Sequence, residues 1–110
     1  MLDRFQRNMD FDAIALVYAH MPIEMRQNVH QKLVQYLKPG GTLILEGFSK
    51  EQISYNSGGP KNIDLLFAED DLLDDFKELK QKEISKQTIE LNEGSFHHGT
   101  ASVIRLTGIK

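Results

Sequence analysis

The stretch Phe11–Phe48, FDAIALVYAHMPIEMRQNVHQKLVQYLKPGGTLILEGF, decides the fold, because it reads as strand, helix, strand. Its first nine residues, Phe11–Ala19, are almost continuously apolar, which is typical of a strand buried on both faces of a parallel sheet. Pro22 suits the first turn of a helix, where its fixed φ and missing N–H are tolerated. The second apolar run, Thr42–Phe48, predicts a second strand. Two strands joined by one crossover helix form a parallel βαβ unit, which is right-handed in nearly all proteins.

Apolar residues recur at three- and four-residue spacing along the predicted helix, at Met25, Val29, Leu33, Tyr36 and Leu37. This spacing predicts a single apolar stripe on one side of the helix. Several polar residues lie off that stripe, namely Arg26, Gln27, His30, Gln31 and Lys38. The run Lys38-Pro39-Gly40-Gly41 is a strong stop signal and predicts the end of the helix.

Composition sets the limits on domain number and on the class of protein. A chain of 110 residues predicts one domain, with residues 11–110 as a single α/β unit and residues 1–10 as a polar lead-in, either a helical turn or a disordered segment. The absence of cysteine excludes disulfides, thiolate catalysis and cysteine-ligated zinc. A net charge of −3 argues against nucleic acid as a partner, and no apolar run reaches the length of ~20 residues that a membrane span needs. We therefore expect a cytoplasmic protein.

The middle of the chain predicts a loop followed by acidic helices. Ser49–Lys61 contains the breaker Ser57-Gly58-Gly59-Pro60 and reads as a flexible loop. Asn62–Phe76 is helix-prone, and a kinked helix and two short helices both fit its pattern. Five carboxylates of this segment are expected to face water, namely Glu69, Asp70, Asp71, Asp74 and Asp75.

The last third of the chain predicts two antiparallel strands. Lys77–Leu91 carries lysines typical of a solvated edge strand, and the odd separation of Ile84 from Ile89 suggests a bulge. Thr100–Ile109 has apolar residues on both sides and therefore belongs inside the sheet. The short loop between the two strands indicates that they pair antiparallel.

Both predicted crossovers, if right-handed, advance in the same direction and cover the same face of the sheet. The other face, and the outer edge of the first strand, would then be open to water. A soluble monomer rarely tolerates a large exposed apolar patch. We therefore expect the chain to self-associate or to need another polypeptide.

The run FDAIALVYAHMP, the helix and the run LKPGGTLILEGF together resemble the C-terminal half of a class I S-adenosylmethionine (SAM)-dependent methyltransferase. The later segments ISYNSGGPKNIDLLF and LNEGSFHHGTASVIRLTG are similar to a bacterial small-molecule branch related to tellurite-resistance methyltransferases. The resemblance implies a partial Rossmann-like sheet made of the fourth to seventh family strands. Their order would be 4-5-7-6, with the last strand antiparallel and the helices mainly on one face.

The resemblance also implies SAM as cofactor and a small-molecule methyl acceptor as substrate. Such enzymes carry a Gly-rich turn after their first strand and an acidic residue after their second, and this chain has neither. Gly40-Gly41 lies between a helix and a strand, which is the wrong topology for a cofactor cradle. We therefore expect the chain by itself to be inactive and to lack an N-terminal half. The competing interpretation is a non-catalytic α/β interaction module that self-associates through its open edge or face.

His20, Met21 and Pro22 follow the predicted first strand, where ligands of open α/β sheets gather. The resemblance assigns the end of that strand and the next residue, Tyr18, Ala19 and His20, to the cofactor side of the cleft. His20 is the candidate catalytic residue, either as a general base or as a polar wall for the acceptor. The structural alternative is a histidine that caps or hydrogen-bonds the strand-to-helix turn.

Four further residues are candidates for the substrate side, namely Glu46, Tyr55, Asn56 and His97. Glu46 lies in an apolar strand, so it either orients a substrate, faces a missing partner or pairs with Arg105 across strands. Tyr55 and Asn56 lie in a loop that could close over substrate or could be an ordinary connection. His97 and His98 are adjacent and point in different directions, so no metal site is predicted.

Overall fold

The predicted βαβ unit is present, formed by β1 (Phe11–Val17), α2 (Ile23–Tyr36) and β2 (Leu37–Phe48). A computed structural model describes residues 10–92 and 98–110 of the chain. β1 and β2 pair in parallel from Ala13 onward, with Leu16 opposite Leu45. The predicted lead-in, apart from Asp10, lies outside the described residues.

The last two strands complete a four-stranded sheet. β3 (Lys80–Asn92) and β4 (His98–Ile109) pair antiparallel, and the strand order is β1-β2-β4-β3. β4 is also antiparallel to β2, so it lies between the parallel part of the sheet and the edge strand β3. The predicted order, with the last strand antiparallel and inside the sheet, is confirmed.

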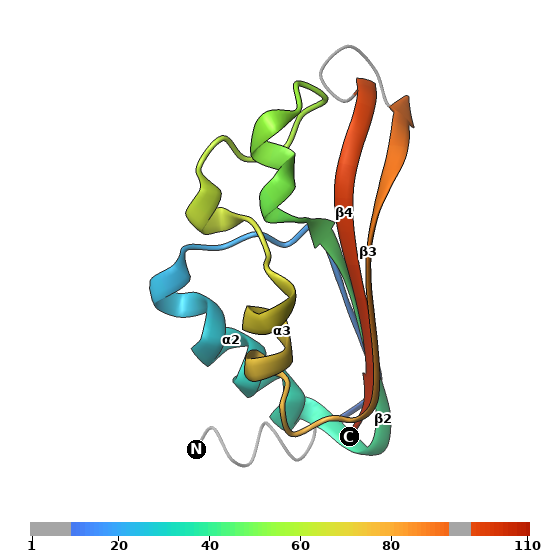
Figure 1. Ribbon diagram of the computed structural model, residues 1–110. Coiled ribbons are helices and arrows are strands. Elements are labelled where there is room, and N and C mark those ends of the chain that lie inside the picture. Colours follow the sequence, from blue (N-terminus) through green and yellow to red (C-terminus); the bar gives the residue numbers. More distant parts are fainter. Residues whose placement is uncertain (1–9, 93–97) are drawn as a thin grey trace.

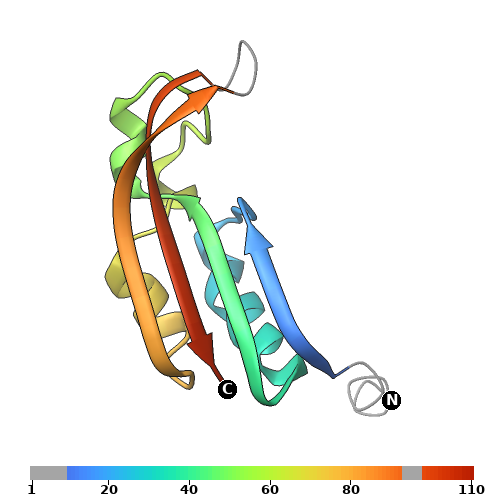
Figure 2. The same ribbon diagram turned by 90° about the vertical axis from the view of Figure 1, so that its right-hand side faces the viewer.

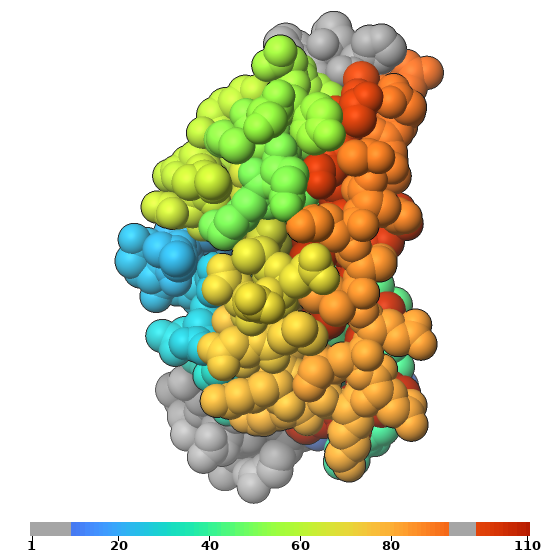
Figure 3. Space-filling view, in the orientation of Figure 1, coloured from blue at the N-terminus to red at the C-terminus, as the bar shows by residue number. Residues whose placement is uncertain are grey.

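The connection from β2 to β3 forms short helices on the same side of the sheet as α2. It contains η1 (Lys50–Ser54), η2 (Ile63–Leu65) and α3 (Glu69–Asp75), so the alternative with short separate helices is correct. Figures 1 and 2 show all of these helices against one face, while the other face of the strands is uncovered. In the space-filling view, α3 packs closely against β3 (Figure 3).

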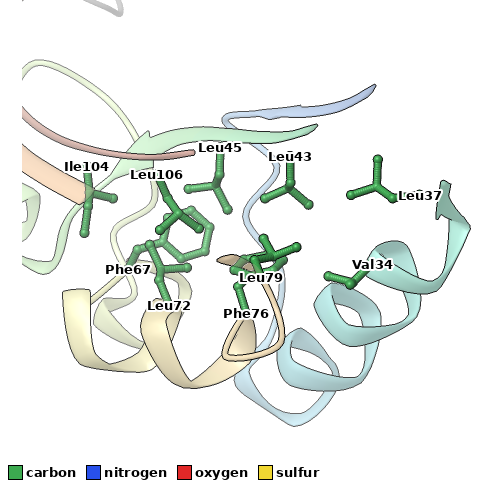
Figure 4. Packing of buried hydrophobic residues seen from close by; sticks show 10 residues of the cluster. All are labelled: Val34, Leu37, Leu43, Leu45, Phe67, Leu72, Phe76, Leu79, Ile104 and Leu106. Carbon is green, nitrogen blue, oxygen red and sulfur yellow. The ribbon is translucent and has the colours of Figure 1, made fainter. Parts of the chain in front are cut away.

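The main core lies between the sheet and the two α-helices. Side chains from β2 and β4 point toward α2 and α3 (Figure 4) and are fully enclosed by them. The cluster consists of Val34, Leu37, Leu43, Leu45, Phe67, Leu72, Phe76, Leu79, Ile104 and Leu106. Burying so many large apolar side chains is the dominant stabilising contribution to the fold.

A second, smaller apolar cluster lies near the carboxyl end of β2. Phe48 and Val103 are opposite each other in the β2–β4 ladder, and a parallel bridge between Ser49 and Phe67 brings Leu66 alongside. Because side chains alternate along a strand, Phe48 points to the face opposite Leu45. This cluster therefore protects only the upper end of the open face.

The predicted apolar stripe of α2 is wrong. The helix buries Arg26, His30 and Val34, whereas Met25 is 46% exposed. Arg26 and His30 are four residues apart and lie on one face, where a carboxylate from α3 meets them. A buried ion pair has thus replaced the apolar contact that the spacing predicted.

Two further predictions about the strands need correction. Ile84 packs against the main core and Ile89 against the second cluster, because they lie on opposite faces of a regular strand. The only register shift in the β3–β4 ladder falls between Lys80 and Glu83, so no bulge separates the two isoleucines. β1 is also not buried on both faces, since Val17 is 63% exposed.

Candidate functional site

The carboxyl end of β1 meets the carboxyl end of β2 at Tyr18. The backbone of Tyr18 adopts a positive φ of 54°, which ends the strand, while its N–H donates to the Glu46 carbonyl at 2.7 Å. Its ring lies against Phe48 with a centroid separation of 4.9 Å. Its hydroxyl donates to Glu46 Oε2 at 2.8 Å. Tyr18 is thus held by backbone, ring and hydroxyl, and Ala19 follows it into the turn toward α2.

Glu46 accepts a second hydrogen bond, from Arg105 on the neighbouring strand. The two residues are opposite each other in the β2–β4 ladder, and Arg105 Nε donates to Glu46 Oε1. Partial burial pushes the pKa of Glu46 upward, but the hydrogen bonds from Tyr18 and Arg105 outweigh it and lower the pKa. Among the alternatives for Glu46, the cross-strand pair with Arg105 is confirmed.

His20 uses both of its ring nitrogens on backbone groups. The Phe48 N–H donates to Nε2 at 3.1 Å, which leaves Nδ1 as the protonated nitrogen that donates to the Leu65 carbonyl at 2.7 Å. The imidazole stacks on Phe67 with a centroid separation of 4.6 Å and an interplanar angle of 23°. His20 therefore ties the turn after β1 to the end of β2 and to the end of η2.

Burial lowers the pKa of His20, and its hydrogen bond to the Leu65 carbonyl raises the pKa by less. The ring is accordingly neutral near pH 7. Its Nε2 lone pair could accept a proton from a substrate only after the Phe48 N–H had been released. The contacts fit the structural alternative for His20 better than a general base, and its catalytic role stays a prediction.

Gly47 makes the approach of these rings possible. A Cβ at this position would lie 2.5 Å from Phe67 Cε2 and 3.2 Å from His20 Nε2. Any larger residue would displace the Phe67 ring and with it the stacked imidazole. The glycine in LEGF is therefore part of what positions His20.

Tyr55 and Asn56 lie in the connection after η1, which is anchored to β4 rather than free. Gln52 is buried and its Nε2 donates to Ser57 Oγ at 2.9 Å, while Ser57 Oγ donates to the Thr100 carbonyl at 2.6 Å. Tyr55 borders a shallow depression together with Glu51, Lys86, Gln87, Thr88 and Ser102. His97 lies outside the described residues, so its assignment to the substrate side stays a prediction.

Sequence reasoning missed a buried ionic cluster between α2 and α3. Asp75 was expected to face water, yet its side chain is only 1% exposed. Its Oδ2 accepts from Arg26 Nε and from His30 Nδ1, each at 2.8 Å. Arg26 Nη1 also lies 3.8 Å from Asp71 Oδ2. The only signal in the sequence was the four-residue spacing of Arg26 and His30 on a helix that precedes an acidic one.

Burial lowers the pKa of His30 most strongly, Asp75 opposes this by hydrogen bond and charge, and Arg26 lowers it further. A neutral ring explains why His30 Nε2 has no hydrogen-bond partner among the described residues. Asp75 Oδ1 and Arg26 Nη1 are buried without a hydrogen bond as well. The side chain of His30 is fully enclosed, so this cluster holds helices together and offers no surface to a substrate.

Three of the described glycines have an apolar side chain where a Cβ would lie. The space beside Gly47 is filled by Phe67, that beside Gly59 by Phe48, and that beside Gly108 by Leu79. Gly41 lies against the backbone of Lys38 at the opposite end of β2 from Tyr18. Gly40, by contrast, has a φ of 83° and no atom within 4 Å of its Cβ position. That the chain lacks a Gly-rich SAM-binding turn stays a prediction.

Within residues 10–92 and 98–110, no group of three or more histidine and carboxylate side chains could hold a metal ion. No helix in the described part of the chain is long and apolar enough to cross a membrane.

Comparison with known proteins shows the fold. No family model and no curated protein sequence matches the chain. Two similar solved structures are a SAM-dependent methyltransferase of Thermotoga maritima, described as a possible histamine N-methyltransferase, and a SAM-dependent methyltransferase of Methanosarcina mazei. Their TM-scores are 0.60 and 0.64 at 17% and 13% sequence identity, and each likeness covers 93% of this chain. The chain spans 57% and 60% of the length of those two proteins, so it has the fold of part of a SAM-dependent methyltransferase.

Proposed function

We propose that this chain is the C-terminal part of a SAM-dependent methyltransferase that acts on a small molecule, in the bacterial branch related to tellurite resistance. One observation carries the proposal: the fold, a sheet of order β1-β2-β4-β3 with helices on one face, is similar to two such enzymes over 93% of the chain. A fold hosts many functions, so the proposal also rests on the residues at the carboxyl end of β1.

In this proposal the carboxyl ends of β1 and β2 supply one wall of the cleft. Tyr18, Ala19 and His20 lie on the cofactor side, and Glu46 lies toward the substrate. The hydrogen bonds of Tyr18 and His20 hold this wall in one geometry before any ligand arrives. Such pre-organisation aligns a methyl donor with its acceptor, which is the main protein contribution to this type of reaction. The neutral ring of His20 orders this wall through its two hydrogen bonds to the backbone.

The remaining part of the enzyme would join the sheet at β1. The β3 edge carries Lys80, Lys82 and Lys86, which discourage pairing, whereas β1 has no lysine. A right-handed crossover that extends the sheet outward from β1 advances in the direction opposite to α2, so its helix lies on the open face. The strand order therefore changes direction at β1, and ligands of such sheets bind at that point.

The test is a nuclear magnetic resonance titration of the chain with S-adenosylhomocysteine. Because the chain supplies only one wall, we expect weak binding, with amide shifts concentrated at Tyr18, Ala19 and His20. Adenosine and methionine, titrated separately, are the controls for non-specific contact. A titration to about millimolar ligand that leaves these three amides unshifted contradicts the proposed wall.

The second candidate function is a non-catalytic interaction module, favoured by the exposed apolar side chains of the open face. Val17, Ile44 and Phe11 are 63%, 43% and 43% exposed. The titration with S-adenosylhomocysteine also separates the two candidates. Saturable shifts at Tyr18, Ala19 and His20, with none for the controls, would exclude a module without a cofactor site.

A further inference from the structure

The two edges of the sheet differ in the features that prevent strand pairing. β3 is charged along its length and begins with a register shift between Lys80 and Glu83. β1 has one charged residue, Asp12, and Lys38 lies 3.5 Å from its carboxylate. The irregularity in the β1–β2 ladder lies between Phe11 and Ala13, where the additional residues belong to β2, so β1 itself is regular. An edge strand that is regular and carries few charged residues pairs readily with another strand.

The backbone of β1 presents a defined set of hydrogen-bonding groups to its outer side. The N–H of Tyr18 points to β2, since it donates to the Glu46 carbonyl at 2.7 Å. Because these directions alternate along a strand, Ala13, Ala15 and Val17 direct their N–H and C=O groups away from β2. No described residue pairs with this outer edge.

We propose that β1 pairs antiparallel with β1 of a second copy of the chain about a twofold axis at Ile14. This register places Ala13 opposite the partner's Ala15 and Phe11 opposite the partner's Val17. All of these residues direct their backbone groups outward, so the hydrogen-bonded pairs of an antiparallel ladder are satisfied on both strands. The result is a continuous eight-stranded sheet with closed symmetry.

The side chains fit this register. Phe11 and Val17 lie on the open face, and an aromatic residue opposite a β-branched one is a stabilising cross-strand pair. Two small residues, Ala13 and Ala15, meet beside the axis and leave room for close approach of the strands. In the dimer, Phe11 of each copy therefore covers Val17 of the other, so both exposed apolar side chains at the ends of β1 become buried.

This inference goes beyond the proposed function and does not depend on it. The remainder of a methyltransferase would occupy the same edge, so the dimer is the state of the chain without that remainder. If the chain dimerises but does not bind S-adenosylhomocysteine, the dimer is supported and the proposed function is not. If the chain binds S-adenosylhomocysteine but stays monomeric, the proposed function is supported and the dimer is not.

Sedimentation velocity of the chain over a concentration series tests the proposal. We expect a dimer at about 100 μM and a dissociation constant that Ala15→Lys raises about tenfold or more. Ala15 is exposed, so lysine at this position leaves the monomer fold intact while it blocks the edge. The matched control is Gln87→Lys, which adds the same charge at an exposed position of β3 and should leave the constant unchanged.

A second variant separates edge pairing from stacking of the open faces. Ala15→Pro removes one outward N–H and no β1–β2 hydrogen bond, so it should prevent the dimer while circular dichroism stays native. Amide exchange at Ala15 should slow as the concentration of the wild-type chain rises. A wild-type monomer at about 100 μM, or a dimer that resists both Ala15 variants, overturns the proposal.

Discussion

The two faces of the sheet are built in opposite ways. The covered face packs a continuous apolar core and, above it, encloses the charged cluster of Arg26, His30 and Asp75. The open face leaves Ile44 43% exposed and places its own ion pair, Glu46 with Arg105, at the border with water. Asp75 and Glu46 look alike in the sequence, yet they contribute to the free energy of unfolding in different ways. Asp75 is fully dehydrated, while Glu46 is only partly so.

The largest expected effect is on the covered face, at Asp75. Asp75→Ala leaves the Arg26 guanidinium buried without its partner, which costs about 3–5 kcal/mol of the free energy of unfolding. The measurement is urea denaturation, at protein concentrations low enough to avoid association. Asp74→Ala is the control, because the exposed side chain of Asp74 bonds only Gln27 among the described residues. The loss in the free energy of unfolding should therefore be about 0.5 kcal/mol. Equal costs for the two variants would mean that the cluster is hydrated in solution.

The next effect is at Gly47, where the covered face is most tightly packed. Gly47→Ala forces the Phe67 ring away and should cost about 1–3 kcal/mol. In a Phe67→Leu background the added methyl group has room, so the same substitution should cost distinctly less. A double-mutant cycle by thermal denaturation measures this coupling. An additive cycle would show that the two residues do not touch in solution.

The two buried histidines predict a smaller, pH-dependent loss of stability. Burial lowers the pKa of His20 and of His30 below their usual value of 6.5. The unfolded chain therefore binds protons more readily, so stability is full above pH 6.5 and falls as the pH drops toward the folded pKa values. Because the pKa values of Glu46 and Glu51 are lowered, protonation of these carboxylates reduces stability only below about pH 4.5, outside this pH range. Urea midpoints from pH 8 to pH 5.5 should decline, and His30→Gln should flatten the decline; a profile that rises on acidification contradicts the assignment.

On the open face the Glu46 pair should contribute much less than the Asp75 cluster. Glu46→Gln keeps the shape of the side chain and removes its charge, and we expect a loss of about 0.5–1 kcal/mol because solvent screens the pair. Combining it with Arg105→Gln in a double-mutant cycle isolates the interaction between the two side chains. A coupling as large as the cost of Asp75→Ala would show that this region is covered in solution.

The smallest effect is expected at Ile44, on the open face between β1 and β4. Ile44→Thr should change the free energy of unfolding by about 0.5 kcal/mol or less, because the side chain is already 43% exposed. Leu43→Ala, on the covered face next to it, should cost about 2–5 kcal/mol. A large loss at Ile44 would reveal that something covers this face.

The sequence predicted the architecture because its signals were local and strong. Continuous apolar runs, the Pro-Gly-Gly stop and the two-sided pattern of the last strand led to the βαβ unit, to an inner last strand and, through right-handed crossovers, to helices on one face. The strand order itself came from the resemblance to methyltransferases. The face of α2 could not be predicted in this way. Arg26 and His30 become interior residues only because Asp75, some 45 positions along the chain, is brought against them.

The sequence predicted where most site residues lie along the strands, but it did not predict most of their hydrogen-bond partners. The sequence placed Tyr18 at the end of the first strand and His20 just after it, and it gave the pairing of Glu46 with Arg105 as one of three alternatives. It could not indicate that the Phe48 N–H and the Leu65 carbonyl take both nitrogens of His20, because these partners depend on how η2 returns to the sheet. Tyr55 and Asn56 lie on a connection whose anchor, the buried Gln52, carries no local signature.

The sharing of Asp75 by Arg26 and His30 has a mechanical consequence. Since one carboxylate oxygen accepts from two side chains of α2, any shift of α3 relative to α2 has to break two buried hydrogen bonds. Lys86 extends the linkage, because its ammonium lies 3.7 Å from Glu69 at the start of α3. The turn after β1 leads directly into α2, so these contacts connect that turn through α3 to the edge strand β3.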